Sequence, residues 1–298
     1  MGIRLTMDVF SGRPNPTVEV TGRRATEVLA GLAPEGRAEE DVGLPDFEPL
    51  GYRGVVVEGT GNGVEQLGRL GLPRTFRVVG KDLVGRNLAR RAADSGLTEA
   101  LLTADGPFAA AQGVDAQFFE TLPRLVADFE RTRENLRRIV PPLDLWLRPI
   151  CQGAPPSDLA WWNDPARCPD NNCYNYGSNY RTDTFAQPGL GAGAMYTEIT
   201  GTAVREAAIR DELVDTPDAD GVCPAIGHLV ALVIAPGWDF HWYRKGRNSR
   251  WSHKPGGTPA TVLDNSGAFI RDPRTADRGM YTEFTTFMVA IQGHIKLA

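Results

Sequence analysis

The chain has 298 residues, of which 42% are hydrophobic and 23% charged, with a formal net charge of −5 at pH 7. This length exceeds that of a usual single domain, so we expect two domains, or one large one, with enough chain to bury a core. The net negative charge does not favour nucleic acid as a partner. The sequence contains no run of about 18 apolar residues, so no membrane span is predicted.

The first 140 residues predict a small α/β or α+β domain without obvious chemistry. The helix at 118–136 has the clearest apolar stripe, although Pro123 leaves open a start at that residue. The glycine-rich segment 59–63 lacks the ending of a phosphate loop and is interpreted as a turn. Pro141-Pro142 predicts the boundary between an accessory domain, 1–140, and a catalytic domain, 141–298. The expected strands are 3–10, 17–20, 52–58 and 75–79, and the expected helices are 23–32, 64–72 and 118–136.

Residues capable of chemistry gather in the second half of the chain. All four cysteines, all four histidines and all six tryptophans lie after residue 145. The cysteine spacing does not match a zinc ribbon or finger, so no metal and no cofactor are predicted. The N-terminus has no apolar core of a signal peptide, which predicts a cytoplasmic location and makes a disulfide framework a weak alternative.

Cys173 is the candidate nucleophile. Asp170, Asn171 or Asn172 is suited to cap a helix that begins near Cys173. A thiol at the positive end of a helix has a lowered pKa, which stabilises the reactive thiolate. The alternative is a buried, inert cysteine.

Three histidines on expected strands are candidates for the base. His228 opens an apolar strand in which residues 228, 230, 232 and 234 share one face and 229, 231 and 233 the other, as in a covered central strand. Asp239, His241 and Tyr243 share a face of the next strand. If the following hairpin is centred on Arg247, with 245–249 as its polar tip, His241 faces His253. The basic run 244–247, with Arg250, is interpreted as part of a solvated hairpin tip.

The order of these residues resembles the NlpC/P60 and CHAP branch of the papain-like cysteine peptidases, over about residues 165–256. The matching positions are Cys173 within Asn-Cys-Tyr-Asn-Tyr, His228 within Gly-His-Leu-Val-Ala-Leu-Val, and His241 as the third residue. The Asp-Cys-Ser signature of that family is absent. The resemblance implies an α+β chain of two domains, the C-terminal one with a papain-like core of a helix and an antiparallel sheet. Residues 239–279 are also similar to uncharacterised bacterial proteins.

The resulting hypothesis is a thiol-dependent acyl-transfer enzyme, most simply an amide or peptide hydrolase, acting on a small-molecule or peptide substrate. Cys173 would attack, and His228, His241 or His253 would act as base, oriented by another of these residues, Asp239 or Asp264. The expected oxyanion donors are the amide of Cys173 and a side chain. The expected oxyanion and substrate-binding residues are Asn171, Asn172, Tyr174, Trp242, Tyr243 and Trp251.

Two other interpretations remain open. Trp238, Trp242, Tyr243 and Trp251 are suited to an aromatic platform in a non-catalytic protein that binds a carbohydrate or a peptide. Alternatively, the three histidines and Asp239 are suited to hold a metal in a metalloenzyme.

Overall fold

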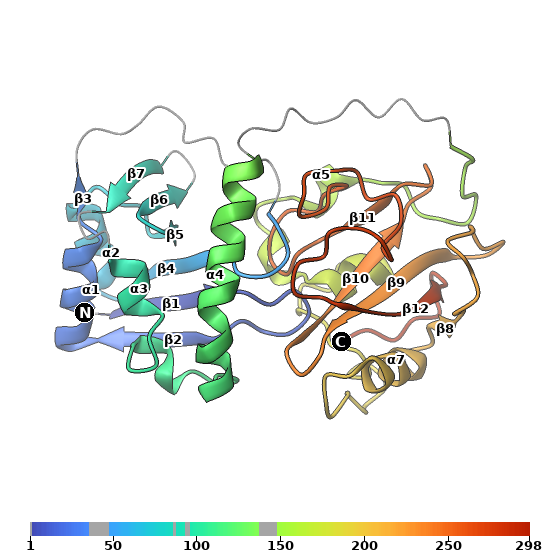
Figure 1. The fold of residues 1–298 in the computed structure, drawn as a ribbon, viewed down its shortest axis with the longest axis horizontal. Coiled ribbons are helices and arrows are strands. Elements are labelled where there is room, and N and C mark those ends of the chain that lie inside the picture. The colour runs from blue at the N-terminus through green and yellow to red at the C-terminus, as the bar shows by residue number, and fades with distance from the viewer. Residues whose placement is uncertain (1, 36–47, 86–87, 93–95, 137–147) are drawn as a thin grey trace. The chain divides into compact units, whose positions relative to one another are not determined.

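The computed structural model describes residues 2–35, 48–85, 88–92, 96–136 and 148–298 (Figure 1). Contacts between residues divide the chain into two compact units. Each unit contains an antiparallel sheet and helices, which confirms the α+β class. The predicted boundary at Pro141-Pro142 lies outside the described residues. The first unit is Met1–Val9, Asn15–Leu44 and Tyr52–Glu130, and the second is Phe10–Pro14, Pro45–Gly51 and Arg131–Ala298.

The first unit is built on a seven-stranded sheet with the strand order β2-β1-β4-β5-β6-β7-β3. Its strands are β1 (Gly2–Asp8), β2 (Thr17–Thr21), β3 (Pro34–Glu35), β4 (Gly54–Thr60), β5 (Thr75–Val79), β6 (Asp82–Gly85) and β7 (Leu88–Ala92). Its helices are α1 (Gly22–Gly31), α2 (Gly63–Arg69), α3 (Leu97–Leu101) and the 3₁₀ turn η1 (Pro107–Ala110), and α4 (Ala116–Leu136) begins in this unit.

Most of the apolar stripe predicted on α4 is buried: Phe118, Leu122, Leu125 and Phe129 are each at most 7% exposed, and Val126 is half-buried. The alternative start at Pro123 was wrong, because α4 already begins at Ala116 and Pro123 lies inside it. The side chain of Asp115 accepts a hydrogen bond from the amide of Phe118 and so caps the first turn.

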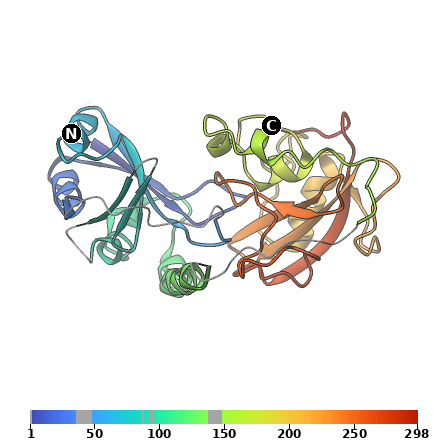
Figure 2. The ribbon, with the colours of Figure 1, turned by 90° about the horizontal axis from the view of Figure 1, so that it is seen from above.

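The second unit is built on a five-stranded sheet with the strand order β11-β10-β9-β12-β8. Figure 2 shows the orange and red strands of this sheet from above. Its strands are β8 (Val214–Asp215), β9 (His228–Ala235), β10 (Asp239–Lys245), β11 (Trp251–His253) and β12 (Glu283–Ala290). Its helices are α5 (Leu159–Trp162), the 3₁₀ turn η2 (Cys168–Asp170), α6 (Cys173–Ser178) and α7 (Gly201–Arg210).

β9 is the central strand of this sheet, and all eight of its residues are buried, as its apolar pattern predicts. Val230, Leu232 and Ile234 pack on one face against side chains from α6 and α7. Leu229, Ala231 and Val233 pack on the opposite face, against loop residues that include Leu50, Ile270 and Tyr281. Both faces of the sheet are therefore covered.

The hairpin of β10 and β11 has a different register from the prediction. Tyr243, not His241, lies opposite His253, and Lys245 lies opposite Trp251. The hairpin is therefore centred on Asn248. The loop closes with Gly246 bonded to the carbonyl of Arg250 and with Ser249 at a φ of 57°.

None of the helices in the described ranges has both the length and the apolar character that a membrane span requires.

Candidate functional site

Helix α6 is held at its N-terminal end by the asparagines that precede Cys173. The side chain of Asn172 accepts hydrogen bonds from the amides of Tyr174 (3.0 Å) and Asn175 (3.1 Å), and Asn175 accepts in return from the Asn172 amide (3.1 Å). This reciprocal arrangement is a capping box, so the predicted helix start is confirmed. Asn171 binds the carbonyl of Arg167 and the carboxylate of Asp183.

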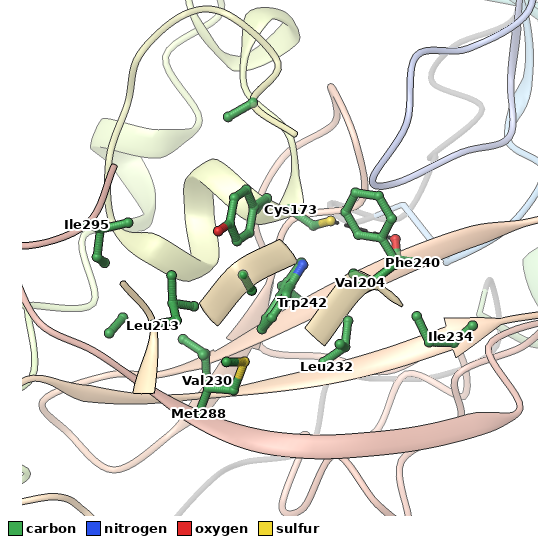
Figure 3. Packing of buried hydrophobic residues seen from close by; sticks show 14 residues of the cluster. Cys173, Val204, Leu213, Val230, Leu232, Ile234, Phe240, Trp242, Met288 and Ile295 are labelled. Atoms are coloured by element: carbon green, nitrogen blue, oxygen red, sulfur yellow. Dashed lines mark hydrogen bonds between the residues drawn. The ribbon is translucent and has the colours of Figure 1, made fainter. Parts of the chain in front are cut away.

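The thiol of Cys173 is enclosed in the core (Figure 3). It is 0% exposed, and its Sγ lies 3.8 Å from the carbonyl oxygen of Phe240, to which it donates. Burial raises the pKa of the Cys173 thiol well above its usual value, and the nearby negative charge of Asp239 adds to this. The helix terminus therefore does not produce a thiolate here, because loss of water outweighs the dipole of a six-residue helix.

His228 lies at the other end of α6. Its Nε2 is 2.7 Å from the carbonyl oxygen of Gly177, so Nε2 carries the hydrogen and donates. Burial lowers the pKa of His228 to about 4, which keeps the imidazole neutral at pH 7. The contact satisfies a carbonyl at the end of a buried helix and does not involve the thiol.

His241 and His253 contact each other diagonally across the hairpin. Nε2 of His241 lies 2.9 Å from Nδ1 of His253, whose Nε2 lies 2.9 Å from the carbonyl oxygen of Leu263. Because that carbonyl can only accept, the Nε2 of His253 carries its hydrogen, and in the neutral tautomer Nδ1 accepts from His241. The ring of His253 stacks on that of Tyr243, at 5.1 Å between centroids.

Asp239 binds main-chain amides of the segment Phe10–Pro14. Its carboxylate accepts from the amides of Ser11 (2.5 Å), Gly12 (3.2 Å) and Arg13 (3.1 Å), and from the hydroxyl of Tyr281 (2.6 Å). Burial raises the pKa of Asp239, while these hydrogen bonds oppose the rise. Asp264, the other predicted orienting residue, instead accepts from the amides of Ser266 and Ala268 in its own turn and from the amide of Asp277.

The residues predicted to bind substrate are buried. Trp242, Tyr243 and Trp251 are at most 3% exposed, so they do not form an exposed aromatic platform. The hydroxyl of Tyr174 donates to Asp211 at 2.8 Å. Within the ranges that the structure describes, no three His, Cys, Asp or Glu side chains form a group able to hold a metal ion.

Two buried cations were missed by the sequence reasoning. The prediction that Arg244 belongs to a solvated hairpin tip was wrong, because Arg244 is 0% exposed. It binds Asn179 Oδ1 at 2.5 Å and lies over the ring of Tyr176. Lys254 donates to the carbonyls of Cys168, Asn171 and Gly256. A useful signal for Arg244 was its alternation with Phe240 and Trp242, which places all three on one face of β10.

Part of the chain is similar to a curated protein. Insoluble matrix shell protein 1 from Ruditapes philippinarum is 48% identical over 130 residues, which are 43% of this chain and 84% of that protein. The chain belongs to the family of insoluble matrix shell protein 1. No protein-family model and no solved structure matches it.

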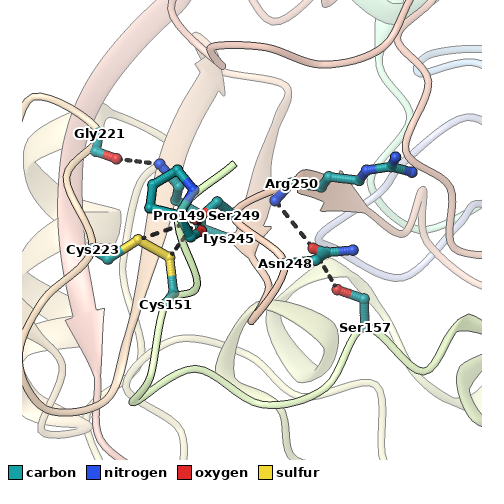
Figure 4. The surroundings of a disulfide bond; sticks show 9 residues. All are labelled: Pro149, Cys151, Ser157, Gly221, Cys223, Lys245, Asn248, Ser249 and Arg250. Atoms are coloured by element: carbon teal, nitrogen blue, oxygen red, sulfur yellow. Dashed lines mark hydrogen bonds between the residues drawn. A yellow bond between two sulfur atoms is a disulfide. The ribbon is translucent and has the colours of Figure 1, made fainter. Parts of the chain in front are cut away.

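This member of the insoluble matrix shell protein 1 family contains a disulfide between Cys151 and Cys223, 72 positions apart (Figure 4). The hydroxyl of Ser249 lies 3.1 Å from the Cys151 sulfur and donates to the carbonyl of Pro149. Lys245 donates to the carbonyl of Gly221, close to the second cysteine. Cys168 and Cys173 are free and buried. The bond therefore ties the segment before α5 to the loop before β9.

Proposed function

We propose that this protein is a structural, non-catalytic component of an extracellular matrix. The observation that carries the proposal is the 48% identity to a protein named insoluble matrix shell protein 1, over 84% of its length. Such a role needs a stable fold and does not need a catalytic group.

The second unit fits this role. Its disulfide is of a kind that persists in oxidising compartments, which supports an extracellular location over the cytoplasmic one expected from the N-terminus. The side chains with catalytic potential serve the fold instead: Cys173 fills the core, and His228 binds a helix carbonyl. The thiol hydrolase with a papain-like core remains a competing proposal, which requires an exposed thiol beside an imidazole.

Fractionation of the source organism tests the proposal. Thiols are blocked with an alkylating agent at lysis, and the extracellular, detergent-insoluble and cytosolic fractions are compared by mass spectrometry. We expect the protein in the insoluble extracellular fraction, with the Cys151 and Cys223 peptides joined in a non-reduced digest. Recovery in the cytosol with both cysteines alkylated would overturn the proposal. A hydrolytic activity that disappears in Cys173→Ala would favour the hydrolase instead.

A further inference from the structure

We propose that Asp239 at the start of β10, with Asn172 and Gln187, forms a binding site for an extended peptide that contains a glycine-arginine pair. In this structure the site is occupied by residues Phe10–Pro14 of the same chain. The inference is independent of the matrix role, because it depends only on contacts inside the second unit, to which Phe10–Pro14 belongs.

The site binds this segment through the main chain of the segment. The three successive amides of Ser11, Gly12 and Arg13 donate to the one carboxylate of Asp239, an arrangement suited to a negative charge. The carbonyl oxygen of Gly12 accepts from the side chains of Asn172 (2.7 Å) and Gln187 (2.8 Å). Asp239 and Asn172 are 0% exposed, and Gln187 is 8% exposed. These buried polar groups therefore pair with a peptide main chain supplied from a distant part of the sequence.

Two features of the site select the peptide sequence. A Cβ atom added to Gly12 would lie 2.4 Å from the ring of Phe240, so a side chain at this position does not fit. The φ of Gly12 is not in the left-handed region, so the restriction comes from Phe240 and not from the backbone. The guanidinium of Arg13 donates to the carbonyl of Trp238 at 2.9 Å and lies 4.2 Å from the ring centre of Phe10.

The position of the bound segment explains why it would exclude other ligands. The amide of Cys173, the first of α6, donates to the carbonyl oxygen of Ser11 at 3.4 Å. The first amides of a helix have no acceptor within the helix, and here a peptide carbonyl accepts from the Cys173 amide. The segment therefore acts as an internal ligand, and a second peptide can enter only when the segment leaves.

Release of the segment by Gly12→Ala tests the proposal. The probe is a fluorescein-labelled peptide with the sequence of residues 10–14, Phe-Ser-Gly-Arg-Pro, and binding is followed by fluorescence anisotropy. We expect saturable binding to Gly12→Ala, and none to the wild type or to Gly68→Ala, a control at a glycine whose added Cβ meets nothing within 4 Å. The same peptide with alanine for glycine should bind at least about tenfold more weakly, because overpacking against Phe240 opposes it.

A second variant keeps the test decisive if Gly12→Ala does not fold. Arg13→Ala removes the contacts with Trp238 and Phe10 but leaves the main-chain bonds, so the native segment is held more weakly and the arginine peptide should compete with it. Near-UV circular dichroism identifies the folded variants. Lack of peptide binding to every folded variant overturns the proposal, as does equal binding to the wild type, which would place the peptide elsewhere.

Discussion

His228 and Cys173 are held at opposite ends of α6. The imidazole binds the carbonyl of Gly177, whereas Cys173 is the first residue of the helix, about 6 Å away along the helix axis. Each side chain has a structural partner of its own: Gly177 for the imidazole, and the Phe240 carbonyl for the thiol. The arrangement accounts for both residues as parts of the core.

The first prediction concerns the reactivity of Cys173. Because the thiol is enclosed and its pKa is raised by burial, iodoacetamide should not label it in the native protein at pH 8 and should label it readily in denaturant. Labelled peptides are identified by mass spectrometry, with Cys168 as the second free thiol for comparison. Rapid native labelling of Cys173 alone, with an apparent pKa below that of a free thiol, would instead support the hydrolase.

The second prediction concerns the contribution of His228 to stability. His228→Ala removes the donor to Gly177 and leaves a cavity, so the free energy of unfolding should fall by about 2–4 kcal/mol. Urea unfolding measures the change. The matched control is His294→Ala, at an exposed histidine near the C-terminus, where we expect a change within about 0.5 kcal/mol. Equal effects at the two positions would contradict the assigned role of His228.

The third prediction concerns pH. The pKa of His228 is lowered from 6.5 to about 4 by burial, with a further contribution from the charge of Arg244. Between these values the unfolded chain binds a proton that the folded protein does not, so stability is lost as the pH falls through this window. Between pH 7 and pH 5 the contribution is about 2 kcal/mol. From pH 7 to pH 5, the free energy of unfolding should therefore fall by about 2 kcal/mol less in His228→Gln than in the wild type. All other titrating groups are present in both proteins, so their contributions cancel in this comparison.

The fourth prediction concerns the disulfide. Because the bond closes a loop of 72 residues, its removal should lower the free energy of unfolding by about 4 kcal/mol. Denaturant unfolding of Cys151→Ala/Cys223→Ala is compared with that of the wild type. A reductant should destabilise the wild type and leave the double variant unchanged. If the two proteins are equally stable without reductant, the bond does not brace the fold.

Local sequence pattern was sufficient for much of the second unit. Strict alternation assigned Val230 and Leu229 to opposite faces of a buried strand, and both faces are covered in the structure. Asparagines before Cys173 predicted the start of α6, because a cap is formed by residues two or three positions apart. These features depend on near neighbours in the chain, so the sequence contains the information needed to predict them.

The hairpin shows where local pattern stops being sufficient. His241 and His253 lie on one face of the sheet in both the predicted and the observed register. Side chains alternate between the two faces, so a register shift of two residues leaves each side chain on the same face. The loop geometry at Gly246 and Ser249 sets the actual pairing, and it places Tyr243 opposite His253. The two imidazoles still meet, but diagonally.

The burial of Cys173 and the partners of His228 and Asp239 were not predictable in this way. They depend on residues far away in sequence: Phe240 lies 67 positions from Cys173, and Ser11 lies 228 from Asp239. A helix start can present a thiol to water or to a core, and the capping pattern is the same in both cases. Packing of α6 against β10 enclosed the thiol, and the loss of water there raised its pKa, which no local pattern encodes.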